Sequence, residues 1–201
     1  MHTLIAVAHP HPASLTHAVA NSLAAGASAS GNDTMEIADL SAEGFDPRFT
    51  QADLLGHQRR APFPADVLAE QARLDRADAL VLVFPVYWWS MPALMKGWID
   101  RVFSNGWAYD DSSGQGVSKK LSHLPIHLVA LGGADHRTWQ KRGYTDAMKT
   151  QIETGIFDYC GAPVRSSTLL LETDAGDAEV HLQTAYTLGQ RIAGETVAAA
   201  H

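Results

Sequence analysis

Apolar residues follow two periods along the chain. Four short segments are almost continuously apolar, and a fifth alternates, which predicts strands in a sheet covered on both faces. These predicted strands span residues 3–8, 34–40, 78–85, 125–131 and 164–171. Between them, apolar residues recur every three or four positions, which predicts amphipathic helices. The predicted helices span residues 14–26, 65–77, 92–103, 144–159 and 177–193.

The predicted strands and helices alternate. This order is typical of a parallel α/β sheet, because right-handed crossovers place helices on both faces. We expect one domain over residues 1–201, with a largely irregular segment at 41–64 that has room for a short helix. Ligands of such sheets bind beyond the carboxyl ends of the strands, so the candidate functional loops are 9–14, 86–91 and 132–142.

The composition of the chain argues against several classes of protein. The chain of 201 residues has a formal net charge of −7 and a pI near 5.7, which argues against a nucleic-acid partner. No apolar run is long enough for a membrane span, so we expect a cytoplasmic protein. The single cysteine, Cys160, excludes an internal disulfide and a thiolate cluster. We expect no metal site, since His9, His11 and His17 have no cysteine or carboxylate at a zinc-like spacing.

The loop after the first strand reads A-H-P-H-P-A-S-L-T-H. Ser14 and Thr16 supply hydroxyls and His9 and His11 supply imidazoles, beside the free amides at the start of a helix. This combination suits a phosphate group. Neither the dinucleotide fingerprint nor the P-loop pattern is present, and an ordinary helix capped by Ser14 remains the alternative.

Three adjacent aromatic residues, Tyr87, Trp88 and Trp89, follow the third predicted strand and lie between Pro85 and Pro92. Three consecutive rings cannot all point into a core, so at least one should line a cavity or an interface. Aromatic walls and backbone donors suit a flat, partly apolar ring such as isoalloxazine. The alternative is that the two tryptophans close the hydrophobic core.

A family resemblance is carried by residues 84–109, which read F-P-V-Y-W-W-S-M-P-A-L-M-K-G-W-I-D-R-V-F-S-N-G-W-A-Y. Together with A-H-P near the N-terminus, the glycine pair at 132–133 and I-F-D-Y-C-G at 156–161, it resembles the flavodoxin-like NAD(P)H:quinone oxidoreductases of the DT-diaphorase type. It is more similar still to short bacterial members, such as the ancillary oxidoreductases of potassium efflux systems. The resemblance implies a five-stranded parallel sheet in the order 2-1-3-4-5.

The resemblance also implies roles for individual residues. The cofactor-binding positions that match the family's motifs are His9, Ser14, Leu15, Thr16, Pro85, Val86, Tyr87, Trp88, Trp89, Leu131, Gly132 and Gly133. Tyr144 is the nearest match to the family's catalytic tyrosine, and Trp107 and Tyr109 match residues of the substrate cavity, which in several members is completed across a dimer. This chain departs from the family at Leu15, where several relatives carry an aromatic residue. It also has A-L-G-G where relatives often have T-T-G-G.

The resemblance implies a flavin enzyme that takes hydride from NAD(P)H and reduces quinones or similar flat acceptors, including azo or nitro compounds. FMN is expected rather than FAD, because the stretch D-A-G-D-A-E-V offers Glu179 and no arginine for an adenylate group. We expect a homodimer. The alternative is a flavin-binding regulatory subunit that associates with a membrane transporter and has only incidental redox activity.

Overall fold

A five-stranded parallel sheet forms the centre of the molecule. The computed structural model describes residues 1–29, 31, 33–171 and 178–199, and its main sheet has the order β2-β1-β3-β6-β7. Counted along the chain, this is the predicted order 2-1-3-4-5. The strands are β1 (His2–Val7), β2 (Thr34–Asp39), β3 (Ala79–Pro85), β6 (Ile126–Gly132) and β7 (Val164–Leu171).

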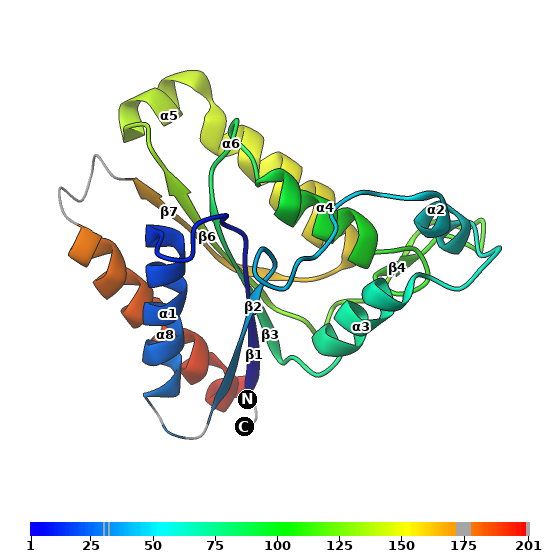
Figure 1. Ribbon diagram of the computed structural model, residues 1–201, viewed down its shortest axis with the longest axis horizontal. Coiled ribbons are helices and arrows are strands. Elements are labelled where there is room, and N and C mark those ends of the chain that lie inside the picture. The colour runs from blue at the N-terminus through cyan, green and yellow to red at the C-terminus, as the bar shows by residue number, and fades with distance from the viewer. Residues whose placement is uncertain (30, 32, 172–177, 200–201) are drawn as a thin grey trace.

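Helices cover both faces of the sheet (Figure 1). The helices α1 (Leu15–Ser28) and α8 (Ala178–Ala199) pack side by side on one face. The other face is covered by α3 (Ala65–Leu74), α4 (Ala93–Val102) and the π-helical segment η1 (Lys149–Asp158). The predicted start of the last helix, Asp177, lies outside the described residues.

The alternation of side chains along the central strands divides the core in two. In β1, Ile5 and Val7 pack with α1 and α8, whereas Leu4 and Ala6 pack with the helices of the opposite face. Consecutive strand residues point to opposite sides, so a strand buried on both faces has to be apolar at every position. The continuous apolar runs in the sequence therefore have a direct structural cause.

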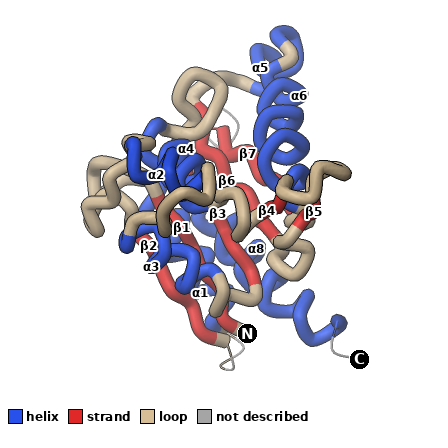
Figure 2. The backbone as a smooth tube through the Cα atoms, turned by 90° about the vertical axis from the view of Figure 1, so that its right-hand side faces the viewer, coloured by secondary structure: helices blue, strands red, loops and turns tan. Residues whose placement is uncertain are grey.

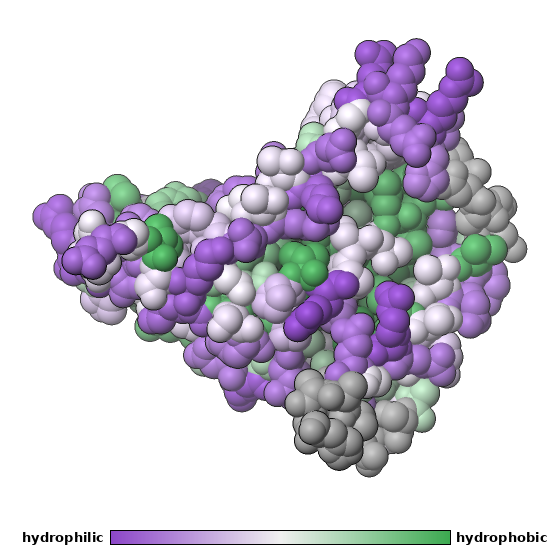
Figure 3. All heavy atoms as spheres, turned by 180° about the vertical axis from the view of Figure 1, so that it is seen from behind, coloured by the Kyte–Doolittle hydropathy of each residue, from purple (hydrophilic) through white to green (hydrophobic). Residues whose placement is uncertain are grey.

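Two regions differ from the predicted elements. The predicted loop at 132–142 contains a helix, α5 (His136–Arg142), which begins where the Asp135 carboxylate accepts the Thr138 amide at 2.7 Å. The predicted helix at 144–159 is divided into α6 (Tyr144–Met148) and η1. The tip of the molecule at α5 is hydrophilic, and hydrophobic side chains are visible in the hollow beneath it when the molecule is seen from behind (Figure 3).

Two small elements complete the fold. Helix α2 (Gln51–His57) lies in the segment predicted to be largely irregular, and Thr50 and Asp53 form a reciprocal capping box at its start. The strands β4 (Tyr109–Asp110) and β5 (Ser118–Lys119) form a separate two-stranded hairpin outside the main sheet (Figure 2).

A buried ion network fixes the segment around α2 against α4. The Arg101 guanidinium donates to Asp53 at 3.0 Å, to Asp66 at 2.6 Å and to the Asp46 carbonyl at 2.8 Å. The side chains of Arg101 and Asp53 are 4% and 0% exposed. Because one guanidinium bonds to Asp46 before α2, to Asp53 in α2 and to Asp66 in α3, it fixes the position of α2 and of the chain that precedes it.

Candidate functional site

The loop after β1 carries hydrogen-bond donors that face no backbone acceptor. Ser14 caps α1, since its hydroxyl accepts the His17 amide at 3.3 Å. The amides of Leu15 and Thr16 donate to no backbone carbonyl among the described residues, as expected for the first turn of a helix. His9 Nδ1 lies 3.0 Å from the His11 amide nitrogen and 3.2 Å from the His11 carbonyl oxygen, so the backbone of the loop holds the ring whichever nitrogen carries the proton.

A cavity of about 320 Å³ lies at the carboxyl ends of the strands, and we call it the strand-end cavity. Its walls come from the loops after β1, β3 and β6, from β7 and from the starts of α1 and α8. The lining residues are His9, Leu15, Thr16, Pro85, Val86, Leu131, Gly132, Gly133, Leu170 and His181. Eight of these ten were predicted as cofactor-binding positions, so the structure brings most of the predicted cofactor residues around one space.

Two polar side chains in this cavity are buried. Thr16 is 2% exposed and lies in the cavity wall. His181 is 5% exposed and its buried Nε2 is unpaired. An unpaired buried polar group is costly unless a ligand or water satisfies it. His181 therefore fits a site for a polar ligand. No sequence motif indicated His181, which lies far from the motif residues along the chain.

The aromatic residues after β3 form a tight turn outside the strand-end cavity. The backbone groups of Tyr87 and Ser90 bond to each other in both directions, at 3.0 and 3.1 Å. Trp88 and Trp89 are the central residues, with φ of +49° and +61°, as in a type I′ turn. Such turns favour glycine or asparagine, so two tryptophans in this conformation store strain. Trp88 is 92% exposed.

The ring of Trp89 stacks on Tyr144, the first residue of α6. Their centroids are 3.5 Å apart and their planes differ by 10°. The buried Trp139 of α5 meets both rings edge-on, at 5.4 and 6.0 Å. The turn after β3 and the region after β6 are therefore joined by a cluster of three aromatic rings. Ser90 of the same turn also bonds to Gln151 in η1.

The two glycines after β6 have different surroundings. A Cβ atom on Gly132 would lie 2.9 Å from Leu171 Cδ2 and 3.1 Å from Trp139 Cζ2. A Cβ atom on Gly133 would meet no atom within 4 Å. Gly132 is thus required by packing, whereas Gly133 leaves open space at the cavity.

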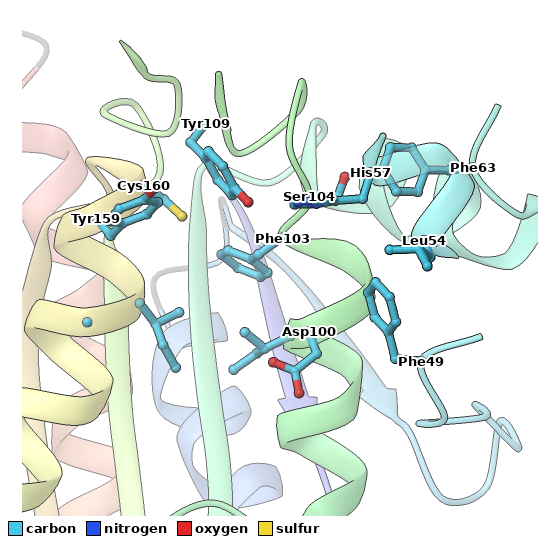
Figure 4. A pocket seen from close by; sticks show the side chains of 13 residues that line it. Phe49, Leu54, His57, Phe63, Asp100, Phe103, Ser104, Tyr109, Tyr159 and Cys160 are labelled. Carbon is cyan, nitrogen blue, oxygen red and sulfur yellow. The ribbon is translucent and has the colours of Figure 1, made fainter. Parts of the chain in front are cut away.

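The predicted substrate residues lie apart from the strand-end cavity. Tyr109 lines a different cavity of about 510 Å³, which we call the Tyr109 cavity. In Figure 4 the rings of Tyr109 and Phe103 lie between the helix that carries Tyr159 and the segment that carries Phe49. Burial, together with Tyr159 and other neighbours, raises the pKa of Tyr109. Trp107 packs edge-on against Phe103 and donates to Asp75 at 3.0 Å, so it is held within its own chain.

Neither a metal cluster nor a membrane span is found in the part of the chain that the structure describes. No three histidine, cysteine or acidic side chains gather there as metal ligands. Its helices are all too short or too polar to cross a bilayer.

The strand order, the helices on both faces and a cavity at the strand ends define a doubly wound α/β protein of flavodoxin-like topology. A family model described as flavodoxin-like fold matches residues 1–189. The chain belongs to this family.

Individual relatives confirm the resemblance to quinone oxidoreductases. A ribosyldihydronicotinamide dehydrogenase [quinone] from Pongo abelii is 33% identical over 208 residues, which covers 94% of this chain and 89% of the relative. The solved NAD(P)H:quinone oxidoreductase from Methanothermobacter marburgensis has a TM-score of 0.83 and 26% identity, over 96% of this chain and 98% of its own. These relatives identify the chain as an enzyme of the oxidoreductase class.

A more distant neighbour shows the same fold. The FMN-dependent NADH-azoreductase from Bacillus anthracis, solved in complex with FMN, has a TM-score of 0.71 and 17% identity, over 98% of this chain and 99% of its own.

Proposed function

We propose that this chain is a flavin-dependent NAD(P)H oxidoreductase that transfers two electrons to quinones or similar flat acceptors. The observation that carries the proposal is the strand-end cavity, where the buried, unpaired Nε2 of His181 and the buried Thr16 meet open glycine backbone. When bound, the flavin supplies hydride chemistry that no side chain of the protein provides.

The phosphate end of a flavin fits the entrance to α1. The donors on or beside the cavity wall are the amides of Leu15 and Thr16 and the Thr16 hydroxyl, and the imidazole of His9 adds a donor when it is cationic. The positive end of the helix dipole adds to their attraction for an anion. The unpaired Nε2 of His181 offers one further polar contact on the α8 side.

The ring end fits the open backbone at Gly133 and the aromatic turn beside it. Val86 and Pro85 line the cavity directly, and Trp89 is held by its stack on Tyr144. We assign Trp88 and Trp89 to the walls that orient flat substrates. We assign the Tyr144 hydroxyl to holding a proton for the reduced ring.

We propose FMN as the flavin. Two structural neighbours were solved with FMN, the azoreductase above and general stress protein 14 from Treponema denticola. The stretch that the sequence offers to an adenylate group, D-A-G-D-A-E-V, lies partly outside the described residues. The proposal of FMN is therefore supported by the phosphate donors at the start of α1 and by the two structural neighbours solved with FMN. FAD is the alternative.

We also propose a homodimer closed over the Tyr109 cavity. The cavity is open and its lining is mostly apolar, and Phe49, Leu54 and Tyr159 at its border are 50%, 44% and 44% exposed. Exposed apolar surface of this kind is typical of an interface. Because Tyr109 lines a different cavity from the cofactor positions of its own chain, a second copy is needed for it to reach a cofactor. Light scattering at micromolar concentration tests the dimer, and a monomeric mass with full activity would exclude it.

The function is tested by loading the purified protein with FMN or FAD and identifying the retained flavin by mass after denaturation. Steady oxidation of NAD(P)H with a benzoquinone is expected. Failure to bind either flavin would overturn the proposal. Retained flavin with negligible turnover would instead favour the regulatory transporter subunit. A cytoplasmic location is part of the same proposal.

A further inference from the structure

A continuous hydrogen-bonded chain joins the end of β2 to the start of α1. His17 Nε2 lies 2.8 Å from Asp39 Oδ2, and His17 Nδ1 lies 2.8 Å from Ser14 Oγ. The side chains of His17 and Asp39 are 12% and 22% exposed. The other Asp39 oxygen accepts the amides of Ser41 and Ala42, both at 3.1 Å. Asp39 is thus fixed by three donors and holds the imidazole in one orientation.

Burial opposes the charged form of Asp39, yet the Ala42 and Ser41 amides and His17 outweigh it and lower the pKa of that carboxyl. An ionised carboxylate only accepts hydrogen bonds. His17 Nε2 therefore carries a proton in both the neutral and the cationic ring. Only Nδ1 differs between the two forms: it is unprotonated in the neutral ring and carries a proton in the cationic ring.

The state of Nδ1 decides what the Ser14 hydroxyl can do. When His17 is neutral, Nδ1 is an acceptor, and the single Ser14 proton points at it. When His17 is cationic, Nδ1–H donates to Ser14, and the Ser14 proton is released for another acceptor. Ser14 directly precedes Leu15 and Thr16, which line the strand-end cavity.

We propose that His17 is a positioning residue that controls whether Ser14 can donate a hydrogen bond to the phosphate of the bound cofactor. Protonation of His17 then strengthens phosphate binding twice, by releasing the Ser14 proton and by placing a cation beside an anion. The inference rests on the proposed flavin site, for which the buried, unpaired His181 Nε2 in the same cavity is independent support.

Two titratable groups are recorded against the His17 ring within the described residues. Asp39 approaches from the end of β2, and the ring of His9 meets it edge-on at 6.2 Å from the loop after β1. His9 and the phosphate of FMN are further ionisable groups at the proposed site. They are the same in wild type and in His17 variants, so a comparison of the two proteins isolates His17.

The test compares FMN with riboflavin, which lacks the phosphate. The ratio of the two dissociation constants, riboflavin over FMN, is measured by flavin fluorescence from about pH 6 to about pH 9, the range that contains histidine titration. The variant His17→Asn keeps an amide N–H toward Ser14 that cannot titrate. His123→Asn is the control, because His123 is exposed and has no assigned part in the cofactor site.

In wild type and His123→Asn, the ratio is expected to fall with rising pH by about ten-fold more than in His17→Asn, the effect of one charge-assisted hydrogen bond. At the alkaline end His17→Asn should prefer FMN more strongly than wild type, which loss of a structural contact would not produce. In a Ser14→Ala background the His17 substitution should no longer change the slope.

Parallel pH profiles in wild type and His17→Asn would overturn the inference while leaving the flavin site intact. The same holds if His17→Asn still changes the slope in the Ser14→Ala background. Failure of wild type to bind either flavin would overturn both the site and the inference. Circular dichroism of each variant confirms that the compared proteins are folded.

Discussion

Trp89 and Tyr144 come from segments more than fifty residues apart in the sequence and stack face to face, with centroids 3.5 Å apart. The contact fixes the ring of Tyr144 at the start of α6, and within the described residues no hydrogen bond of its hydroxyl is recorded. Ring position and hydroxyl chemistry can therefore be separated by substitution.

Tyr144→Phe keeps the stacked ring and removes the hydroxyl. We expect hydride transfer from NAD(P)H, measured by stopped-flow absorbance of the flavin, to slow by about 10- to 100-fold, the usual effect of losing a group that assists proton movement. Tyr144→Leu removes the ring as well and should also weaken flavin binding. If Tyr144→Phe transferred hydride to the flavin as fast as wild type, the Tyr144 hydroxyl would have no catalytic role.

Trp88 is strained and exposed at the same time, with φ of +49° and 92% of its surface accessible. Trp88→Asn should stabilise the fold by about 0.5–1 kcal/mol, because asparagine tolerates the left-handed region and little burial is lost. The same change should raise KM for quinones, since an aromatic wall is removed. Trp88→Ala is the control, and it should raise KM without stabilising the fold in urea unfolding.

The glycine pair offers a matched test of packing against ligand approach. Gly132→Ala should destabilise the fold by about 1–3 kcal/mol, because its methyl group would overlap Leu171 and Trp139. Gly133→Ala meets no protein atom, so its melting temperature should stay near that of wild type while its affinity for flavin falls. Equal flavin affinity in Gly133→Ala and wild type would contradict the assignment of this backbone to the ring.

Arg101→Met should cost about 3–5 kcal/mol of unfolding free energy, because it leaves the buried Asp53 without its cation. Lys96→Met is the matched control on the same helix. Its partner Asp100 lies 2.6 Å away, but both side chains are more than 40% exposed, so less than about 1 kcal/mol should be lost. If Arg101→Met and Lys96→Met lost similar amounts of unfolding free energy, the Arg101 network would not stabilise the fold more than an exposed ion pair does.

His127 gives the fold a pH dependence. Burial, helped by Arg191 and Arg165, lowers the pKa of His127 to about 4, so the unfolded chain binds a proton more readily than the native one between that value and the ordinary 6.5. Stability contributed by neutral His127 is complete above about pH 6.5 and is lost as pH falls toward 4. At pH 5 the loss relative to pH 7 should be about 2 kcal/mol.

The substitution His127→Gln should remove this part of the acid sensitivity, as measured by urea unfolding at both pH values. The exposed His123 serves as the control through His123→Gln. If His127→Gln lost stability on acidification as steeply as wild type, another group would have to be responsible.

The strands were predictable because burial on both faces leaves only one kind of sequence, a continuous apolar run. Helix α5 was missed because it is short and polar and has one buried side chain, Trp139. Its boundary residues, Asp135 and Gly143, did carry ordinary helix-start and helix-stop signals.

The gathering of His9, Val86 and Gly132 around one cavity was predictable, because the carboxyl ends of parallel strands meet at one edge of the sheet. The conformation of Trp88 was not predictable from the sequence. Its left-handed backbone opposes the local preference of tryptophan and is imposed by the surrounding fold. His181 reaches the cavity from α8 through tertiary packing alone, without any motif.

Cys160 lies in the wall of the Tyr109 cavity, and burial raises the pKa of its thiol to about 11. Quinones are electrophiles that add to thiolates by Michael addition, and the thiol form is far less nucleophilic. A protein that works on such compounds would alkylate itself if a reactive sulfur stood beside their path. Because burial lowers the thiolate fraction of Cys160, quinones that enter this cavity, as we propose, would alkylate its sulfur more slowly than that of an exposed cysteine.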